Sequence, residues 1–261
     1  MAAPRRRSRA LRVVGIVLVS LVLLVAGLGY STFGGLAAIE DGEHVGATVE
    51  IVQDGYVSAA IVDLGEGHVA LVDCGNDPAA ASILRALARH HLGPDDVSTI
   101  LLTHGHRDHV AGCAQFRHAD VYALAADVAQ AEGHEGPRGP IGWVASASPT
   151  GLTVDHPLED GATVRRENAE IEVFAVPGHT AGSAAYLVDG VLFVGDSASL
   201  TSEGTLVAAP WIFTEDQAQN VASMHALADR LEHEHALVTA IVTAHSGVVT
   251  EGDPLALLRG M

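Results

Sequence analysis

Apolar and polar residues alternate along this chain in two groups of short runs, and helical patterns accompany each group. Short apolar or alternating runs that are bounded by turn residues predict strands. The strands expected in the first group are residues 49–52, 56–62, 68–73, 97–102 and 120–124. Those expected in the second group are residues 169–176, 183–188, 191–194 and 236–243. The expected helices are residues 78–92, with Asp77 as the N-cap, 109–116, 125–132 and 214–233.

Strands in two groups, each accompanied by helices, indicate an α/β (α+β) fold. Two sheets would pack face to face with helices on both outer surfaces, which makes a four-layer αββα sandwich. The chain has 261 residues, a length that one such domain can accommodate. We see no repeat of fixed period.

The N-terminal residues have a different character. Residues 1–12 contain five arginines and no acidic residue, and the core that follows, Val13 to Leu28, is almost purely aliphatic. Its length lies between a signal-peptide core and a membrane span. We expect residues 13–33 to form a hydrophobic helix that serves as a transmembrane anchor, with a cleaved signal peptide as the alternative. Residues 34–46 would then be a linker, and residues 47–261 the catalytic domain.

The basic flank also predicts a location. Arginines beside an apolar segment stay in the cytoplasm under the positive-inside rule. The domain would therefore lie outside the cytoplasm, anchored to the membrane, or would be secreted or periplasmic if the segment is cleaved.

Charge narrows the choice of partners. The chain has no lysine, and the residues after position 12 include 9 basic and 32 acidic ones, a net charge of −23. Such a field repels nucleic acid and argues against a nuclease. We expect a small-molecule substrate.

Candidate chemistry is concentrated between Thr103 and Gly112, directly after an expected strand. His104 and His106 are two residues apart, so in extended chain they point to the same side and can bind one metal ion as a pair. Asp108 and His109 lie where the chain turns into the next helix, and they can reach a second ion. Imidazole and carboxylate together suit a borderline cation such as zinc.

This HxHxDH sequence resembles the metallo-β-lactamase superfamily, and four further motifs stand in that family's order. They are the DxG-like segment Asp73-Cys74-Gly75, the PGHTxGS-like segment Pro177 to Ser183, the dipeptide Gly195-Asp196, and the histidine of Thr243 to Gly247. The resemblance extends from about Val49 to Gly247 and implies a metallo-β-lactamase-like αββα sandwich.

The resemblance also implies a metal site with two Zn²⁺ ions per chain, with iron or manganese as possible replacements. The first ion would be bound by His104, His106 and His179, the second by Asp108, His109 and His245, and Asp196 would bridge them. Two such ions can hold a hydroxide between them, lower its pKa, aim it at a carbonyl carbon or a phosphorus, and stabilise the developing oxyanion. Asp108 would also be catalytic, as a proton acceptor from the nucleophile.

Two aspartates have alternative interpretations. Asp196 is followed by Ser197, and in one β-lactamase subclass the serine of such a pair contacts the water network while the aspartate is not a ligand. We expect Asp73 to orient the histidine-bearing loop, with a plain turn or cap as the alternative. The other ten histidines lie outside the motifs, and we expect them to be surface or core residues.

The implied function is a dinuclear-zinc hydrolase that uses a metal-bridging hydroxide to cleave a small ester, thioester, lactone or amide. The alternatives are a β-lactam hydrolase and a mononuclear iron redox member of the superfamily. Glyoxalase II relatives bind glutathione through a helical region after the last ligand, and only 16 residues follow His245 here, which argues against that specificity. Trp143, Trp211 and Phe213 would either contact an apolar group of the substrate or simply pack.

The two cysteines, Cys74 and Cys113, leave two possibilities. They could form a disulfide in an oxidising compartment if their positions allow it, or they could be two small buried thiols. Neither stands where the resemblance places a metal ligand.

Overall fold

The computed structural model describes the backbone of residues 5–261 and the side chains of residues 11–27, 29–30 and 33–261. The chain divides into two compact units, of which the first ends at Leu36 and the second comprises Ala37–Met261.

The first unit consists of one helix, α1 (Arg5–Phe33), so the predicted N-terminal hydrophobic helix is present. Its described aliphatic side chains, from Leu11 to Val25, are exposed. Within the described part of the chain, no helix is both long enough and apolar enough to cross a membrane. The transmembrane anchor predicted at residues 13–33 is therefore not supported. Most of the predicted basic segment 1–12 lies outside the residues with described side chains.

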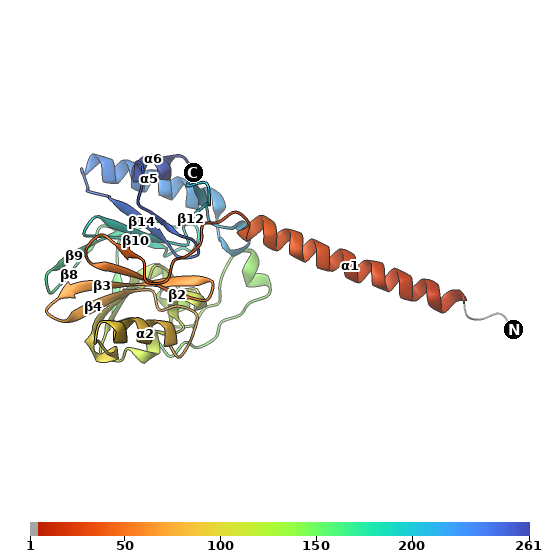
Figure 1. Ribbon diagram of the computed structural model, residues 1–261, viewed down its shortest axis with the longest axis horizontal. Coiled ribbons are helices and arrows are strands. Elements are labelled where there is room, and N and C mark those ends of the chain that lie inside the picture. The colour runs from red at the N-terminus through yellow and green to blue at the C-terminus, as the bar shows by residue number, and fades with distance from the viewer. Residues whose placement is uncertain (1–4) are drawn as a thin grey trace. The chain divides into compact units, whose positions relative to one another are not determined.

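Two mixed sheets form the centre of the second unit (Figure 1). The first sheet contains, in spatial order, β1 (His44–Val45), β2 (Val49–Asp54), β3 (Val57–Gly65), β4 (His68–Val72), β5 (Val97–Leu101), β6 (Asp120–Leu124) and β7 (His156–Leu158). The second contains β15 (Val248–Val249), β14 (Ala240–Thr243), β11 (Val191–Gly195), β10 (Ala184–Val188), β9 (Ala169–Ala175) and β8 (Thr163–Arg166). A separate pair is formed by β12 (Ala198–Leu200) and β13 (Leu206–Ala208).

Helices cover both outer faces of the sandwich. The helix α2 (Ala81–Arg89) lies against the first sheet, whereas α5 (Gln217–His233) and α6 (Pro254–Arg259) lie on the second (Figure 1). Two short helices, α3 (Arg107–Val110) and α4 (Val128–Ala131), belong to connections at the edge of the first sheet.

Three apolar cores correspond to the three interfaces between four layers. The central core joins the two sheets through residues such as Val62, Ile171 and Tyr186. A second core packs α2 on the first sheet, and a third packs α5 and α6 on the second; examples are Ile83 and Leu87 in the second core and Leu227, Leu231 and Leu258 in the third. The predicted αββα sandwich is thereby confirmed.

Strand direction brings the motif residues together. The strands β4, β5 and β6 are parallel neighbours, so their carboxyl ends meet at one edge of the first sheet. Asp73 follows β4, and the Thr103–Asp108 loop follows β5. In the second sheet β11 and β14 are also parallel, and they end at Gly195-Asp196 and just before His245.

Several element boundaries differ from the prediction because side chains form turns there. The helix predicted from residue 78 begins at Ala81, since the Asp77 carboxylate accepts hydrogen bonds from the Ala79 and Ala81 N–H groups in a preceding turn. The helix predicted from residue 214 begins at Gln217 and is capped by Asp216. The helix predicted over residues 125–132 begins as a 3₁₀ turn, Ala125–Asp127, and continues as α4.

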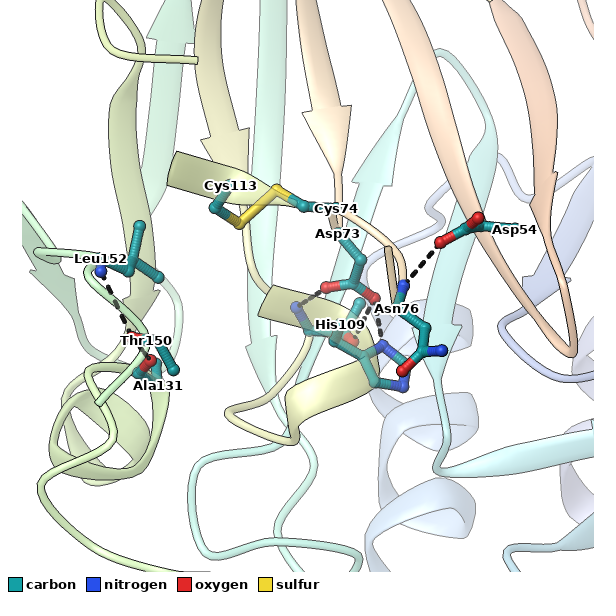
Figure 2. Close-up of a disulfide and its surroundings, with 10 residues drawn as sticks. Asp54, Asp73, Cys74, Asn76, His109, Cys113, Ala131, Thr150 and Leu152 are labelled. Carbon is teal, nitrogen blue, oxygen red and sulfur yellow. Dashed lines mark hydrogen bonds and ion pairs between the residues drawn. A yellow bond between two sulfur atoms is a disulfide. The ribbon is translucent and has the colours of Figure 1, made fainter. Parts of the chain in front are cut away.

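The two cysteines form a disulfide, with Cα atoms 5.2 Å apart. Cys74 follows Asp73 directly, and its N–H donates to the His109 carbonyl oxygen at 2.7 Å. Figure 2 shows the disulfide beside Asp73 and His109. The alternative of two free thiols is therefore wrong, and the cross-link ties the segment after β4 to the segment after α3.

Loss of this cross-link should destabilise the domain. The disulfide joins positions 39 residues apart, so replacing both Cys74 and Cys113 by Ala should lower the free energy of unfolding by about 2–4 kcal/mol. Urea denaturation of the metal-free proteins measures the change, and reduction of the wild type should cause a similar loss. Identical urea midpoints for the variant and the oxidised wild type would contradict a stabilising disulfide.

Candidate metal centre

The seven side chains predicted as ligands lie in two adjoining clusters. The first cluster contains His104, His106, His179 and Asp196, and the second contains Asp108, His109 and His245. Within each cluster, one nitrogen or oxygen atom of every residue lies within 4.8 Å of the corresponding atoms of the others. The fold thus brings together every predicted site residue.

The first cluster has the spacing of a tetrahedral ligand set. His179 Nε2 lies 3.2 Å from His104 Nε2, 3.0 Å from His106 Nδ1 and 3.5 Å from Asp196 Oδ2. Bonds of about 2.0–2.1 Å to a tetrahedral zinc ion would place ligand atoms roughly 3.3 Å apart. Neutral imidazole nitrogens cannot all satisfy one another by hydrogen bonding, so this donor set fits a cation at its centre.

Asp196 contacts both clusters. Its Oδ2 lies 3.0 Å from His245 Nε2, and its Oδ1 lies 3.2 Å from His109 Nε2. His245 Nε2 is also 3.4 Å from Asp108 Oδ2. Because Oδ2 also lies 3.5 Å from His179 Nε2, it stands between a histidine of each cluster, which is the position expected of a bridging ligand.

Hydrogen bonds fix the outer nitrogens of the histidines in the second cluster. His109 Nδ1 donates to Asp73 Oδ2 at 2.8 Å, and His245 Nδ1 donates to the Tyr56 carbonyl oxygen at 2.8 Å. With the proton on Nδ1, each ring turns the lone pair of Nε2 toward the cluster. Such outer partners are typical of histidines that bind metals.

The same arrangement applies to the first cluster. Thr103 Oγ1 donates to Asp73 and therefore accepts from His104 Nδ1, 3.2 Å away. Thr214 Oγ1 donates to a backbone carbonyl and accepts from His179 Nδ1 at 3.4 Å. Both rings again direct Nε2 inward, so four of the five imidazoles have their tautomer set from behind.

Burial keeps the three histidines of the first cluster uncharged. His104 and His179 are almost completely buried. Burial and nearby His109 lower the pKa of His104 well below its ordinary value, and burial lowers the pKa of His106. Burial also lowers the pKa of His179 to about 3. These rings therefore retain their lone pairs at neutral pH.

Carboxylates dominate the second cluster. Burial alone would lower the pKa of His109, but Asp196 and Asp73 raise this pKa well above its ordinary value. Asp196 likewise raises the pKa of His245 against the effect of burial. Burial alone would raise the pKa of Asp196, but His245 and His109 hold this pKa well below the usual range. The negative charge that favours protons here would equally favour a metal cation.

Asp73 has the contacts expected of a residue that orients the loop. Its Oδ1 accepts from the Thr103 N–H at 2.8 Å, and its Oδ2 accepts from Thr103 Oγ1. The same Oδ2 accepts from His109 Nδ1 (Figure 2). It adopts a left-handed backbone, with φ of 59°, at the end of β4. Thr103, Tyr56 and Thr214 were not predicted, because nothing in the sequence marks a hydroxyl or carbonyl group that fixes a histidine.

A glycine allows the second sheet to approach this loop. Gly195 has φ of 53°, and a Cβ atom there would lie 2.6 Å from Thr103 Oγ1. Asp196 consequently enters the cluster next to the first motif. Ser197, which follows it, is buried, and no described group forms a hydrogen bond with its Oγ.

One exposed aromatic residue contacts the site, and two others are exposed on neighbouring 3₁₀ turns. Tyr56 is 60% exposed, and its ring stacks on His245 with an interplanar angle of 9°. Trp143 and Trp211 are 84% and 54% exposed, so core packing is not their role, while Phe213 is half-buried. The 3₁₀ turns that carry them, Pro140–Trp143 and Trp211–Phe213, contact each other.

Comparison with known proteins gives the same family on several grounds. The family model described as the metallo-β-lactamase superfamily matches residues 52–240. A hydroxyacylglutathione hydrolase of Salmonella paratyphi A is 32% identical over 154 residues, which cover 58% of this chain and 49% of that protein. One from Pectobacterium carotovorum is 34% identical over 150 residues, with the same coverage. The chain spans about half the length of the curated relatives it matches.

Solved structures share the fold. A B3 metallo-β-lactamase with an active-site glutamic acid superposes with a TM-score of 0.64 at 22% identity, covering 87% of each chain. A metallo-β-lactamase family protein from Thermus thermophilus gives a TM-score of 0.56 at 25% identity, covering 81% of this chain and 75% of that one. With its sandwich fold, its converging histidines and aspartates and this match over most of its length, the chain belongs to the metallo-β-lactamase superfamily.

Proposed function

We propose that this protein is a dinuclear-zinc hydrolase that cleaves a small thioester or ester, with lactones and amides as related substrates. The observation that carries the proposal is the position of Asp196, whose two carboxylate oxygens face histidines of both clusters. When bound, two zinc ions would activate a water molecule and polarise the carbonyl oxygen of the substrate.

The residues around the clusters divide the remaining work. His104 and His179 are buried and close the site from behind, whereas the side chains of Asp108 and His245 are 21% and 16% exposed. The substrate would therefore approach from the side of Asp108. Its carboxylate can accept the proton of the nucleophile and deliver it to the leaving group.

The choice of thioester rests on the relatives. Both curated relatives described above are named hydroxyacylglutathione hydrolases, and an acylglutathione is a thioester. The contact of Asp196 with histidines of both clusters supports a bridging aspartate over the alternative in which the aspartate is not a ligand. The exposed Tyr56 and Trp211 side chains can accommodate an apolar acyl group.

We also propose that the domain acts outside the cytoplasm. The support is the Cys74–Cys113 disulfide, since such bonds persist mainly in oxidising compartments. Thiol trapping in intact cells, followed by mass measurement, should find both cysteines protected before reduction and labelled after it. Two labelled cysteines without reduction would contradict this location.

A substrate comparison tests the proposed reaction. The purified chain should hydrolyse a short acyl thioester faster than a lactone or a chromogenic cephalosporin. A chelator should abolish this turnover and added zinc should restore it. If only the cephalosporin is cleaved, the protein is a β-lactamase. If no compound is cleaved and the protein holds one iron ion, it is a redox member of the superfamily.

Replacement of His106 tests the metal ligands. His106→Ala removes one donor of the first cluster, so zinc content should fall by one ion per chain and turnover by at least about 100-fold. The matched control is His118→Ala, because the side chain of His118 is 70% exposed and pairs only weakly with Asp95. Full activity in His106→Ala would exclude the metal mechanism.

A further inference from the structure

A buried carboxylate outside the two clusters joins the loops that carry them. Asp127 lies beyond the carboxyl end of β6, next to the strand that delivers the first histidine motif. Its side chain is 2% exposed. It contributes no atom to either cluster, and the sequence motifs do not include it.

The Asp127 carboxylate accepts three hydrogen bonds from two separate loops. Oδ2 accepts from the Gly105 N–H at 2.8 Å and from Thr180 Oγ1 at 2.7 Å. Oδ1 accepts from the Gly182 N–H at 2.8 Å. Gly105 stands between His104 and His106, and Thr180 follows His179. All three histidines of the first cluster are therefore one residue away from a group that Asp127 holds.

Two glycines show how closely both loops approach this segment. A Cβ atom at Gly105 would lie 2.7 Å from the Ala131 nitrogen, and one at Gly182 would lie 2.8 Å from Asp127 Oδ1. Neither position has room for a side chain. These contacts explain why glycine stands at both positions.

We infer that Asp127 positions the three histidines of the first cluster, so that the affinity of the first metal site depends on it. A carboxylate suits this task because both of its oxygens accept hydrogen bonds, whereas an amide would direct N–H donors at one of the two loops. The inference rests on the proposed function. Asp73 has the corresponding position in the second cluster, where it binds His109 directly.

The test is a metal titration of the full chain with Co²⁺, followed by its absorption spectrum, and repeated with Zn²⁺. The wild type should bind two ions. Asp127→Asn should raise the Kd of one ion by about 10–100-fold and leave the other unchanged. In a His106→Ala background, where the first site is already lost, adding Asp127→Asn should not change the Kd of the remaining ion.

The matched control is Asp155→Asn. Asp155 Oδ2 accepts from the Val121 N–H at 3.0 Å, so this carboxylate also holds a backbone donor beside β6 but touches neither metal loop. If Asp127 were only a stabilising residue, both variants would lower the stability of the metal-free chain and neither would change the affinity of one site selectively. That result would overturn the inference, as would unchanged affinity for both ions in Asp127→Asn.

A second pair of variants covers the case in which Asp127→Asn does not fold. Thr180→Val removes one of the three donors and should raise the Kd of the same ion by a smaller factor. Thr180→Ser keeps the hydroxyl and should leave this Kd unchanged. Equal affinities in these two variants would contradict the inference while leaving the proposed function intact. A wild-type chain that binds no metal would overturn the proposed function and this inference with it.

Discussion

The structure depends on one electrostatic constraint, which is that five imidazoles and two carboxylates face one another where the parallel strands of both sheets end. Without a cation their lone pairs and negative charges would repel or would have to capture protons, as the raised pKa of His109 and His245 indicates. The surrounding hydrogen bonds resist relaxation of this arrangement. His109, His245, His104 and His179 are all held at Nδ1, so none can turn its lone pair away without losing a partner. The site is prepared for metal before metal binds.

The sandwich supplies this arrangement through the direction of its strands. Each sheet contributes parallel strands whose carboxyl ends lie at the same edge, and the motif residues follow those ends. The central core between the sheets then fixes the distance from His104 to Asp196. Two carboxylates outside the set of seven, Asp73 and Asp127, connect loops from different strands by accepting hydrogen bonds from backbone and hydroxyl donors. The disulfide at Cys74 adds a covalent link on the side of Asp73.

Much of this could be predicted from the sequence because the ligands lie in contiguous motifs. The HxHxDH segment names four donors at once, and the order of the later motifs places His179, Asp196 and His245 beside them. Residues that contact the site from distant parts of the sequence belong to no motif, so the sequence did not indicate them. Tyr56 supports His245 from a position 189 residues away, and Asp127 lies in a segment whose sequence resembles the start of an ordinary helix. Short strands such as β7 and β8 were missed because pairing across the sheet, rather than local pattern, defines them.

If the proposed function is right, these seven side chains form two adjacent metal sites with Asp196 between them. A crystal structure of the zinc-loaded protein, with anomalous data collected on both sides of the zinc absorption edge, tests this most directly. Two anomalous peaks are expected, one among His104, His106 and His179 and one among Asp108, His109 and His245, with Asp196 in contact with both. A single peak, or two peaks with Asp196 bound to neither, would contradict this arrangement.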